Sequence, residues 1–511
     1  MVFCRSLAVN NHTHKARPKS IGLNGILQFC NFVVACLIFS GFFQEKLTNH
    51  LYVNWLTLVL GLALCLQTHI ALRLEKRNPD PFVLIMAYLL VFFYSLRIFT
   101  LLLYPVQVVF LRYTYTPADT NYALLFILTA NVFIYAGFYR VKFGSAAEIN
   151  TVGYKPTKPR FGVLLFVVSV LFGLFVQKNI AESIAPFINL IYNNFLTPNI
   201  ILLVLAAYII PFHKRLPPIY IKFLLGGAAI ILVLQTLSFS RSGLLTFVDT
   251  LLVVVLALLP TIRLPRKLVF TGFALLPFLM ATAFTFYSIS TVSRMVKGDS
   301  SVTVAEKVEL FQVSLDKIRN DPRTDFFIGQ ALSRAGYFDY SAELIAHSDR
   351  YAGLFTVVNY LKSIVDNVFT PGFDVFDQPR ISNSLRYVGS SSGAGSKIEE
   401  IVENYHSDQF GLYGEMYNLF GYASLIILYL MSYLLKKAFL YKGRFNICMI
   451  ALSRILVLSV FFQLMNSFGL DWILANILIS SASFYCLSKI FQIRLHGRII
   501  QPFDVVRIRE S

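Results

Sequence analysis

The chain has 511 residues, of which 56% are hydrophobic and only 14% are charged, and its mean hydropathy is +0.63. Soluble globular domains carry about 25% charged residues. A chain of this length with so few charges cannot cover the surfaces of several soluble domains, which excludes a soluble enzyme and a disordered or fibrous protein. The composition predicts an all-α, polytopic integral membrane protein, because the apolar stretches are long enough to be helices rather than barrel strands.

Apolar runs of the length of a membrane-spanning helix, about 17 to 25 residues, recur along the chain. They predict about 12 transmembrane helices, at residues 21–43, 51–72, 81–104, 120–139, 161–181, 197–213, 219–237, 243–260, 268–291, 411–435, 446–467 and 470–492. The run at 197–213 is short and has a proline near each end, so we expect it to be tilted or partly re-entrant.

The basic residues indicate how these spans are oriented. The formal net charge is +18, and Lys and Arg gather in the N-terminal tail, in every second short connection and in the C-terminal tail. In the alternate short connections, which are predicted on the outer side, the basic residues are only Lys46, Arg112, Lys178 and Arg241. Because basic connections stay in the cytoplasm, both termini are predicted to be cytoplasmic. The positive charge is therefore a topology signal, and no nucleic-acid partner is expected.

One connection, residues 292–410, is far longer than the others and is predicted on the outer side of the membrane. It contains 12 Lys and Arg against 16 Asp and Glu, so it is acidic while the rest of the chain is basic. Apolar residues recur at helical spacing in 303–319 and 341–368, whereas 389–396 contains only Gly, Ser and Ala, as a mobile lid or linker does. We favour a substrate-binding cap over a docking surface for another protein.

These features predict three parts. Residues 1–291 form an N-terminal transmembrane bundle of nine helices, and residues 292–410 form the partly helical outer loop domain. Residues 411–511 form a C-terminal bundle of three helices and a short basic cytoplasmic tail. The six cysteines all fall in spans or on the cytoplasmic side, which indicates neither a disulfide framework nor a metal site.

Ionisable residues inside or beside spans indicate where function lies, because each is costly there. Arg97 lies about 16 residues into its span, roughly 24 Å along a helix, which is near the outer boundary of the bilayer. Snorkelling to outer headgroups is the alternative explanation of Arg97. Arg241 follows Ser240 in a predicted outer turn between two spans, against the charge bias, so we expect it to have a function.

The end of the long connection supplies the other candidates. Tyr405, His406 and Asp408 precede the tenth span, and Glu415 lies within its first turns. His406 suits a general base near neutral pH. Glu415 needs a partner inside the membrane, for which Arg97 or Arg241 would serve. Arg294, just after the ninth span, joins Arg97, Ser240 and Tyr405 as predicted substrate-binding residues, while His406, Arg241, Glu415 and Asp408 are the predicted catalytic residues.

Arginines, a histidine, buried acid and a flexible cap on one outer face suit one kind of ligand. Arginine binds diphosphate bidentately without a metal, so no metal or other cofactor is expected. A ligand held half in the bilayer would be a lipid-linked diphosphate. Its sugar would project into the outer loop, whose Tyr, Asn and Asp content suits carbohydrate.

The layout resembles the bacterial surface-polysaccharide polymerases of the Wzy type and the related O-antigen ligases of the WaaL type. Ser240 and Arg241, followed by an apolar helix, resemble the Ser-Arg turn of those families. His406, Glu415 and Gly421 resemble the His-Asn pair, glutamate and glycine-rich helix at the end of their large loop, although Ser407 replaces the asparagine.

The resemblance implies a glycosyltransferase of the bacterial cytoplasmic (inner) membrane, acting in O-antigen, capsule or exopolysaccharide assembly. Its substrates would be undecaprenyl-diphosphate-linked glycans, with membrane lipid, a chain-length regulator and a flippase as partners. The arginines would stabilise the departing diphosphate, and His406, Asp408 or Glu415 would accept the proton of the attacking hydroxyl.

Three alternatives to a polymerase remain open. One is a multi-span lipid-to-protein glycosyltransferase, whose usual acidic pair in the first outer loop is missing, since residues 44–50 offer only Glu45. An O-antigen ligase would transfer the finished glycan to a lipid core, and the replacement of asparagine by Ser407 disfavours it. A flippase or other transporter usually has two repeated halves, and the long connection at 292–410 has no counterpart in the first half of the chain.

Overall fold

The structure, a computed structural model, is mainly helical. It describes residues 20–45, 47, 50–74, 79–103, 116–141, 159–176, 192, 196–237, 241–259, 263–265, 337–366, 375–376, 381, 411–441, 447–466 and 469–470, together with separate positions between 267 and 274 and between 473 and 486. The cysteines among these residues are all free thiols.

Within this described part, six helical stretches are long and apolar enough to cross a membrane. They are Leu23–Phe43 (α2 and the 3-10 turn η1), Trp55–Leu74 (α3), Pro81–Leu103, Pro117–Arg140 (α6), Gly411–Leu440 and Cys448–Met465, which belongs to Ile447–Met465 (α22). The structure is thus consistent with a helical membrane protein. The predicted spans at 268–291 and 470–492 lie mostly outside the described residues, so the count of twelve stays a prediction.

Further apolar helices accompany these six. They are Arg160–Leu171 (α7), which continues as the π-helical turn Phe172–Val176 (η5), Pro198–Ile209 (α9), Pro218–Leu237 (α10) and Arg241–Leu258 (α11). Helix α9 has 12 residues, about 18 Å of helix, which is shorter than the hydrocarbon core. The tilted or partly re-entrant arrangement of 197–213 stays a prediction.

Three helices begin in the same way, with a polar cap followed by proline. The cap side chain accepts a backbone N–H of the first turn, and proline suits the first helical position because its missing N–H has no partner there anyway. The pairs are Asp80 and Pro81, Thr116 and Pro117, and Thr197 and Pro198. At Thr116 a full capping box is present, since Asp119 accepts the backbone N–H of Thr116 in return. These local signals fix where the spans enter the bundle.

The span at Pro81–Leu103 is not a uniform helix. It consists of Pro81–Leu89 (α4), the π-helical turn Leu90–Ser95 (η3) and Leu96–Leu103 (α5). The bounds match the predicted span at 81–104, but hydropathy gave no sign of the π turn. A π turn inserts one residue into the helical ladder and so changes which side chains face inward after it. Arg97 lies immediately beyond this turn and is 2% exposed.

The tenth predicted span, 411–435, differs from the expectation of one continuous helix. The structure has Gly411–Phe420 (α20), a 3-10 turn at Gly421–Ala423 (η9) and Ser424–Leu440 (α21). Gly421 has φ of +54°, a left-handed conformation that interrupts a helix and that glycine adopts without strain. As a result α20 packs on the helices of the long connection, while α21 packs along α6.

The long connection contributes three short described helices, Tyr337–Ala346 (α15), Ser348–Tyr351 (α16) and Val357–Ile364 (α17). Helix α15 packs against α20, α6 and η3, and every residue from 337 to 345 is buried. The helical prediction for 341–368 is therefore confirmed in kind, with a break between α16 and α17. The segments predicted at 303–319 and 389–396 lie outside the described residues.

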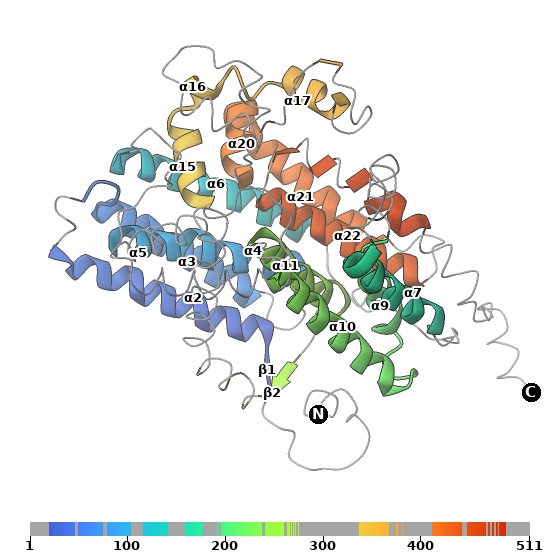
Figure 1. The fold of residues 1–511 in the computed structure, drawn as a ribbon. Helices are drawn as coiled ribbons and strands as arrows, with labels where there is room; N and C mark the ends of the chain where they lie inside the picture. Colours follow the sequence, from blue (N-terminus) through green and yellow to red (C-terminus); the bar gives the residue numbers. More distant parts are fainter. Residues whose placement is uncertain are drawn as a thin grey trace, which may run out of the picture.

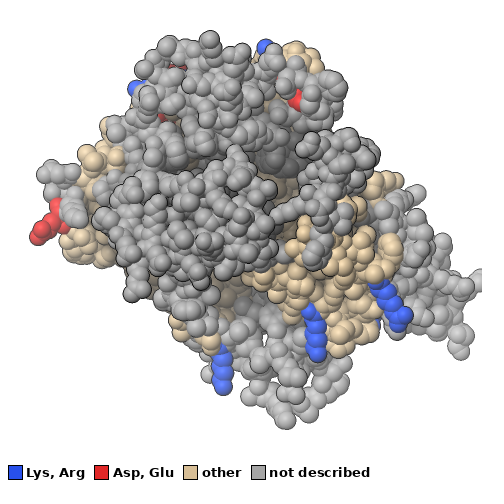
Figure 2. Space-filling model, in the orientation of Figure 1, with Lys and Arg blue, Asp and Glu red and all other residues tan. Residues whose placement is uncertain are grey.

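The all-α description needs one small correction. Ser20–Gly22 (β1) pairs antiparallel with Arg263–Pro265 (β2), just before α2 and just after α11. In Figure 1 this strand pair lies at the bottom of the view, and α16 and α17 lie at the top. On the face shown in Figure 2, basic side chains project from the lower edge, the side of the strand pair. We call the side with β1 and β2 the strand end, and the region where α15–α17 pack the loop end.

Polar contacts join helix ends as an alternating up-and-down order requires. Asn24 Nδ2 donates to Leu72 O at 2.8 Å, which joins the start of α2 to the end of α3 at the strand end. Thr57 Oγ1 donates to Asn121 Oδ1 at 2.7 Å, which joins the starts of α3 and α6. These are the ends that the charge pattern predicts on common sides. The assignment of the strand end to the cytoplasm stays a prediction.

A buried ion pair holds α4, α6 and α21 together. Lys436 Nζ of α21 lies 2.5 Å from Asp80 Oδ2 at the start of α4, and it donates to Phe138 O near the end of α6 at 2.8 Å. Both charged side chains are at most 2% exposed. Because an isolated charge is costly in an apolar interior, each member of this pair depends on the other.

Helices α6 and α21 touch through Gly137. A Cβ atom at this position would lie 2.5 Å from Tyr429 O and 2.9 Å from Ser432 Cβ, which leaves no room for a side chain. Small residues permit such backbone contact between membrane helices.

We therefore expect Gly137→Ala to lower the thermal stability of the detergent-purified protein, because overpacking costs about 1–3 kcal/mol. Gly226→Ala is the matched control, since a Cβ at Gly226 meets nothing within 4 Å. Size-exclusion chromatography after stepwise heating measures both variants. Equal melting of the two would show that α6 and α21 do not pack this closely.

Candidate functional site

Buried ionisable groups gather at the loop end, where α15 meets the membrane-spanning helices. Asp339 and Glu343 lie one turn apart on α15, Glu415 lies on α20, and Arg97 lies on α5. Each is at most 2% exposed. Ionisable side chains in such surroundings are retained at a cost in stability, which favours a functional explanation for the group.

Arg97 is paired with Asp339. Its Nη2 lies 2.7 Å from Asp339 Oδ2, and its Nε lies 3.1 Å and 3.2 Å from the two carboxylate oxygens. This fork-like contact is the strong, directional pairing that arginine makes with carboxylates. It joins residues 242 positions apart in the chain, and so attaches the long connection to the third span. The charge of Asp339 also raises the pKa of Tyr52, after the larger effect of burial, so Tyr52 lies close by.

Glu415 is held by donors from two other segments. Tyr360 of α17 donates its hydroxyl to Glu415 Oε1, and the backbone N–H of Leu470 donates to the same oxygen at 2.8 Å. Gly414 lets α20 approach α15, because a Cβ there would lie 2.9 Å from Leu344 Cδ1. The carboxylate therefore joins α20, α17 and the chain after α22.

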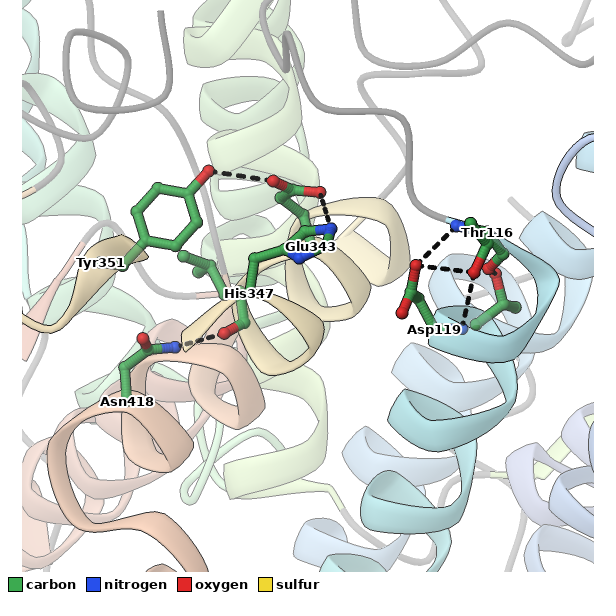
Figure 3. A network of polar contacts seen from close by, with 8 residues as sticks. Thr116, Asp119, Glu343, His347, Tyr351 and Asn418 are labelled. Carbon is green, nitrogen blue, oxygen red and sulfur yellow. Dashed lines mark hydrogen bonds and ion pairs between the residues drawn. The ribbon is translucent and has the colours of Figure 1, made fainter. Parts of the chain in front are cut away.

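Of the three carboxylates, Glu343 accepts a hydrogen bond on only one of its two oxygens among the described residues. Tyr351 donates its hydroxyl to Glu343 Oε1 at 3.2 Å, and His347 Nε2 lies 3.7 Å from Oε2, as Figure 3 shows. Burial raises the pKa of Glu343 to about 7, against smaller opposing effects of Tyr351 and Arg350. Burial also lowers the pKa of His347, and the charge of Arg350 adds to that effect. A glutamate whose pKa is raised to about 7 and a histidine whose pKa is lowered thus lie side by side.

Helix α11 also approaches this region. Burial raises the pKa of Tyr337, the first residue of α15, and the charge of Asp249 on α11 raises it further. Asp249 lies eight residues, about 12 Å, after Arg241 on the same helix. The helix that starts with Arg241 therefore passes the beginning of α15.

The structure describes some of the predicted site residues and not others. It brings Arg97 and Glu415 to the same end of the bundle, and it makes Arg241 the first residue of α11 rather than part of a turn. The side chain of Arg241 lies outside the described residues, as do Ser240, Arg294, Tyr405, His406 and Asp408. In the sequence, His406 and Asp408 precede the start of α20 at Gly411 by only five and three residues.

The structure pairs Arg97 with the carboxylate of Asp339 rather than with Glu415, and it gives Glu415 the donors Tyr360 and Leu470. A pairing of Glu415 with Arg241 stays a prediction. Sequence reasoning also missed Asp249, Glu343 and His347. A signal for Asp249 was present, since it is an acidic residue inside an apolar run. No local signal pointed to Asp339 or Glu343, which lie in a segment with many acidic residues.

No protein-family model matches the chain, and no curated protein or solved structure matches it either.

The arrangement suits proton transfer and the binding of polar groups at the loop end. The carboxylate of Glu343 lies beside Tyr351 and His347, and that of Glu415 lies beside Tyr360. Asn418 joins α20 to α15. Among the described residues, no group of three or more His, Cys, Asp and Glu side chains converges as metal ligands do.

A double-mutant cycle separates the structural role of Arg97 from its predicted role in substrate binding. Arg97→Leu and Asp339→Leu each leave one buried charge alone, and we expect each to cost about 3–5 kcal/mol in unfolding free energy. The double variant removes both charges and should recover most of that loss. Thermal unfolding in detergent measures all four proteins. Additive losses would contradict the pairing, and a stable but inactive double variant would support substrate binding by Arg97.

The raised pKa of Glu343 predicts a pH-dependent stability. Its folded pKa of about 7 lies above the usual value of 4.5, so the folded state binds the proton more tightly than the unfolded state does. This carboxyl group destabilises the fold progressively as the pH rises from 4.5 to 7. Glu343→Gln should therefore melt at a higher temperature than the wild type at pH 8, with the difference shrinking toward pH 5. A pH-independent difference would contradict the assignment.

Proposed function

We propose that the chain is a twelve-span protein of the bacterial cytoplasmic membrane, with both termini in the cytoplasm, and that it polymerises undecaprenyl-diphosphate-linked oligosaccharide repeat units at the outer face. The product would be an O-antigen, capsule or exopolysaccharide chain. The resemblance of the sequence to Wzy-type polymerases is the source of this proposal, and six apolar helices of membrane-spanning length are consistent with its location.

The observation that supports it most is the attachment of a buried, polar helix of the long connection to one end of an apolar bundle. Helix α15 brings Asp339 and Glu343 to Arg97 and to the helix of Glu415. A reaction on a lipid-linked diphosphate needs ionisable groups at the end of the bundle, where the lipid tail stays in the bilayer and the sugar leaves it. A buried polar helix at one end provides such a place.

The proposed chemistry is one glycosyl transfer. A hydroxyl of the acceptor repeat attacks the anomeric carbon of the donor glycan, a new C–O bond forms, and the bond between that carbon and the diphosphate oxygen breaks. The electron pair leaves with the diphosphate, which Arg241 stabilises as its charge develops. His406, Asp408 or Glu415 accepts the hydroxyl proton.

The other residues have binding roles in this proposal. Ser240, Arg294 and Tyr405 contact the lipid-linked donor. Arg97 contacts it too if Asp339 gives up part of the guanidinium, whose Nε and Nη2 it now occupies. No metal takes part in this scheme, because arginines neutralise the diphosphate.

The experiment is deletion of the gene in its native host, followed by complementation. Wild type, Arg241→Ala, His406→Ala and the control Arg215→Ala are compared by gel electrophoresis of the surface glycan, with membrane abundance measured for each. Arg215 is an exposed arginine in the connection before α10, so its loss removes a charge away from the loop end.

A polymerase predicts loss of the long-chain ladder on deletion while a single lipid-linked repeat persists. Wild type and Arg215→Ala should restore the ladder, and Arg241→Ala and His406→Ala should reduce it by at least 100-fold at equal abundance. Long chains that stay on the polyprenyl carrier would support a ligase instead. Repeats that accumulate only on the cytoplasmic leaflet would support a flippase.

A further inference from the structure

Glu343 differs from the other carboxylates of the loop end in the hydrogen bonds and ion pairs that its oxygens make. Asp339 is paired with Arg97, and Asp366 accepts the backbone N–H groups of Val375 and Phe376. Asp119 caps α6, and Glu415 accepts from Tyr360 and Leu470. Each of these carboxylates has a fixed structural donor or cation.

Glu343 has a fixed donor on one oxygen only. Tyr351 donates to Oε1, while Oε2 is buried and accepts no hydrogen bond among the described residues. The side chain is 0% exposed, so bulk water does not reach this oxygen. The group nearest to Oε2 in Figure 3 is the imidazole of His347, with Nε2 at 3.7 Å. This distance is longer than a hydrogen bond, and catalytic contacts of this kind commonly tighten only when substrate binds.

The backbone fixes the position of His347. Its N–H donates to Glu343 O at 2.9 Å at the end of α15, and its carbonyl accepts the N–H of Arg350 at 3.0 Å at the start of α16. The side chain is 20% exposed, so the imidazole reaches from the buried carboxylate toward the surface. A buried carboxylate that orients a partly exposed imidazole is the arrangement by which proteins prepare a histidine to accept a proton.

From this geometry we infer that Glu343 and His347 form the proton-accepting pair for the acceptor hydroxyl, with His347 as the base and Glu343 as the residue that positions it. The inference rests on the proposed function and gives His347 the proton-accepting role for which His406, Asp408 and Glu415 are the candidates above. When Glu343 is ionised, Nε2 carries its hydrogen toward Oε2, which leaves the lone pair of Nδ1 to accept a proton.

The proton balance follows from that arrangement. The hydroxyl oxygen forms the bond to the anomeric carbon, its proton moves to Nδ1 of His347, and Glu343 stabilises the imidazolium. The proton then leaves to water through the exposed side of the ring. No oxidant, reductant or metal is required.

The charges of Arg350, Asp349 and Asp119 and the hydroxyl of Tyr351 act on the pair. Further titratable groups on α15 and on the elements packed against it are Asp339, Tyr94 on η3 and Glu415 on α20. Since the pKa of Glu343 lies at about 7 and that of His347 is lowered, the ionised carboxylate and neutral imidazole coexist above pH 7. Polymerisation should therefore increase as the pH rises through 7.

The test uses the full-length protein in native membranes, supplied with the lipid-linked repeat unit of its host. The rate of chain growth is measured from pH 5.5 to 8.5 for wild type, His347→Gln, Glu343→Gln and Arg215→Gln. The last variant is the matched control, because it removes an exposed charge in the connection before α10, away from Glu343 and His347. We expect His347→Gln to lose at least about 100-fold. Glu343→Gln should be slower and should lose the increase near pH 7, and Arg215→Gln should resemble wild type.

An unchanged rate and pH profile in His347→Gln, at equal membrane abundance, would overturn the inference while leaving the polymerase proposal intact. A wild-type protein that makes no polymer would overturn the proposed function instead. The pairing is then tested without activity, by the rate of diethyl pyrocarbonate modification of His347 at pH 8, followed by mass spectrometry. The ionised carboxylate that accepts the imidazole N–H makes the ring more nucleophilic, so the pairing predicts slower modification in Glu343→Gln than in wild type, and equal rates would overturn it.

Discussion

The ion pair between Arg97 and Asp339 is the contact on which the arrangement of the loop end depends. Burying two charges carries a large desolvation cost, which only a close and well-directed pairing offsets. Here the guanidinium faces both carboxylate oxygens within 3.2 Å, and neither side chain is more than 2% exposed. Because each charge stabilises the other, α15 cannot leave the bundle without separating Arg97 from this carboxylate inside an apolar span.

The position of α15 determines that of the other groups. Once Asp339 is fixed, Glu343 lies one helical turn further along, beneath Tyr351 and beside His347. Gly414 permits α20 to lie against the same helix, and Asn418 donates to Leu344 O at 2.7 Å, so Glu415 is fixed relative to α15 as well. A single long-range ion pair thus orders carboxylates from separate parts of the chain.

Hydropathy predicted the six apolar helices of membrane-spanning length, because such a helix is a local property of the sequence. The orientation inferred from the charge pattern stays a prediction. The starts at Asp80, Thr116 and Thr197 follow from caps and prolines within a few residues. The partner of Arg97 could not be predicted, since Asp339 lies 242 residues away among many acidic residues. The π turn at Leu90–Ser95 depends on packing rather than on composition, and so it too was invisible in the sequence.

The two ends of the bundle differ in the sign of their buried groups. Toward the strand end, Lys436 is paired with Asp80 and Arg454 lies 5.3 Å from the ring of Phe439, so the buried charges include an additional cation. Toward the loop end, Arg97 accompanies the buried carboxyl groups of Asp339, Glu343, Asp366 and Glu415. So many carboxylates would repel a diphosphate, so the α15–α20 region suits neutral hydroxyl groups, those of the acceptor and those of the donor glycan that Arg97 contacts. Under the proposed function, the diphosphate therefore belongs nearer to Arg241 at the start of α11, and the glycosidic bond forms between these two regions.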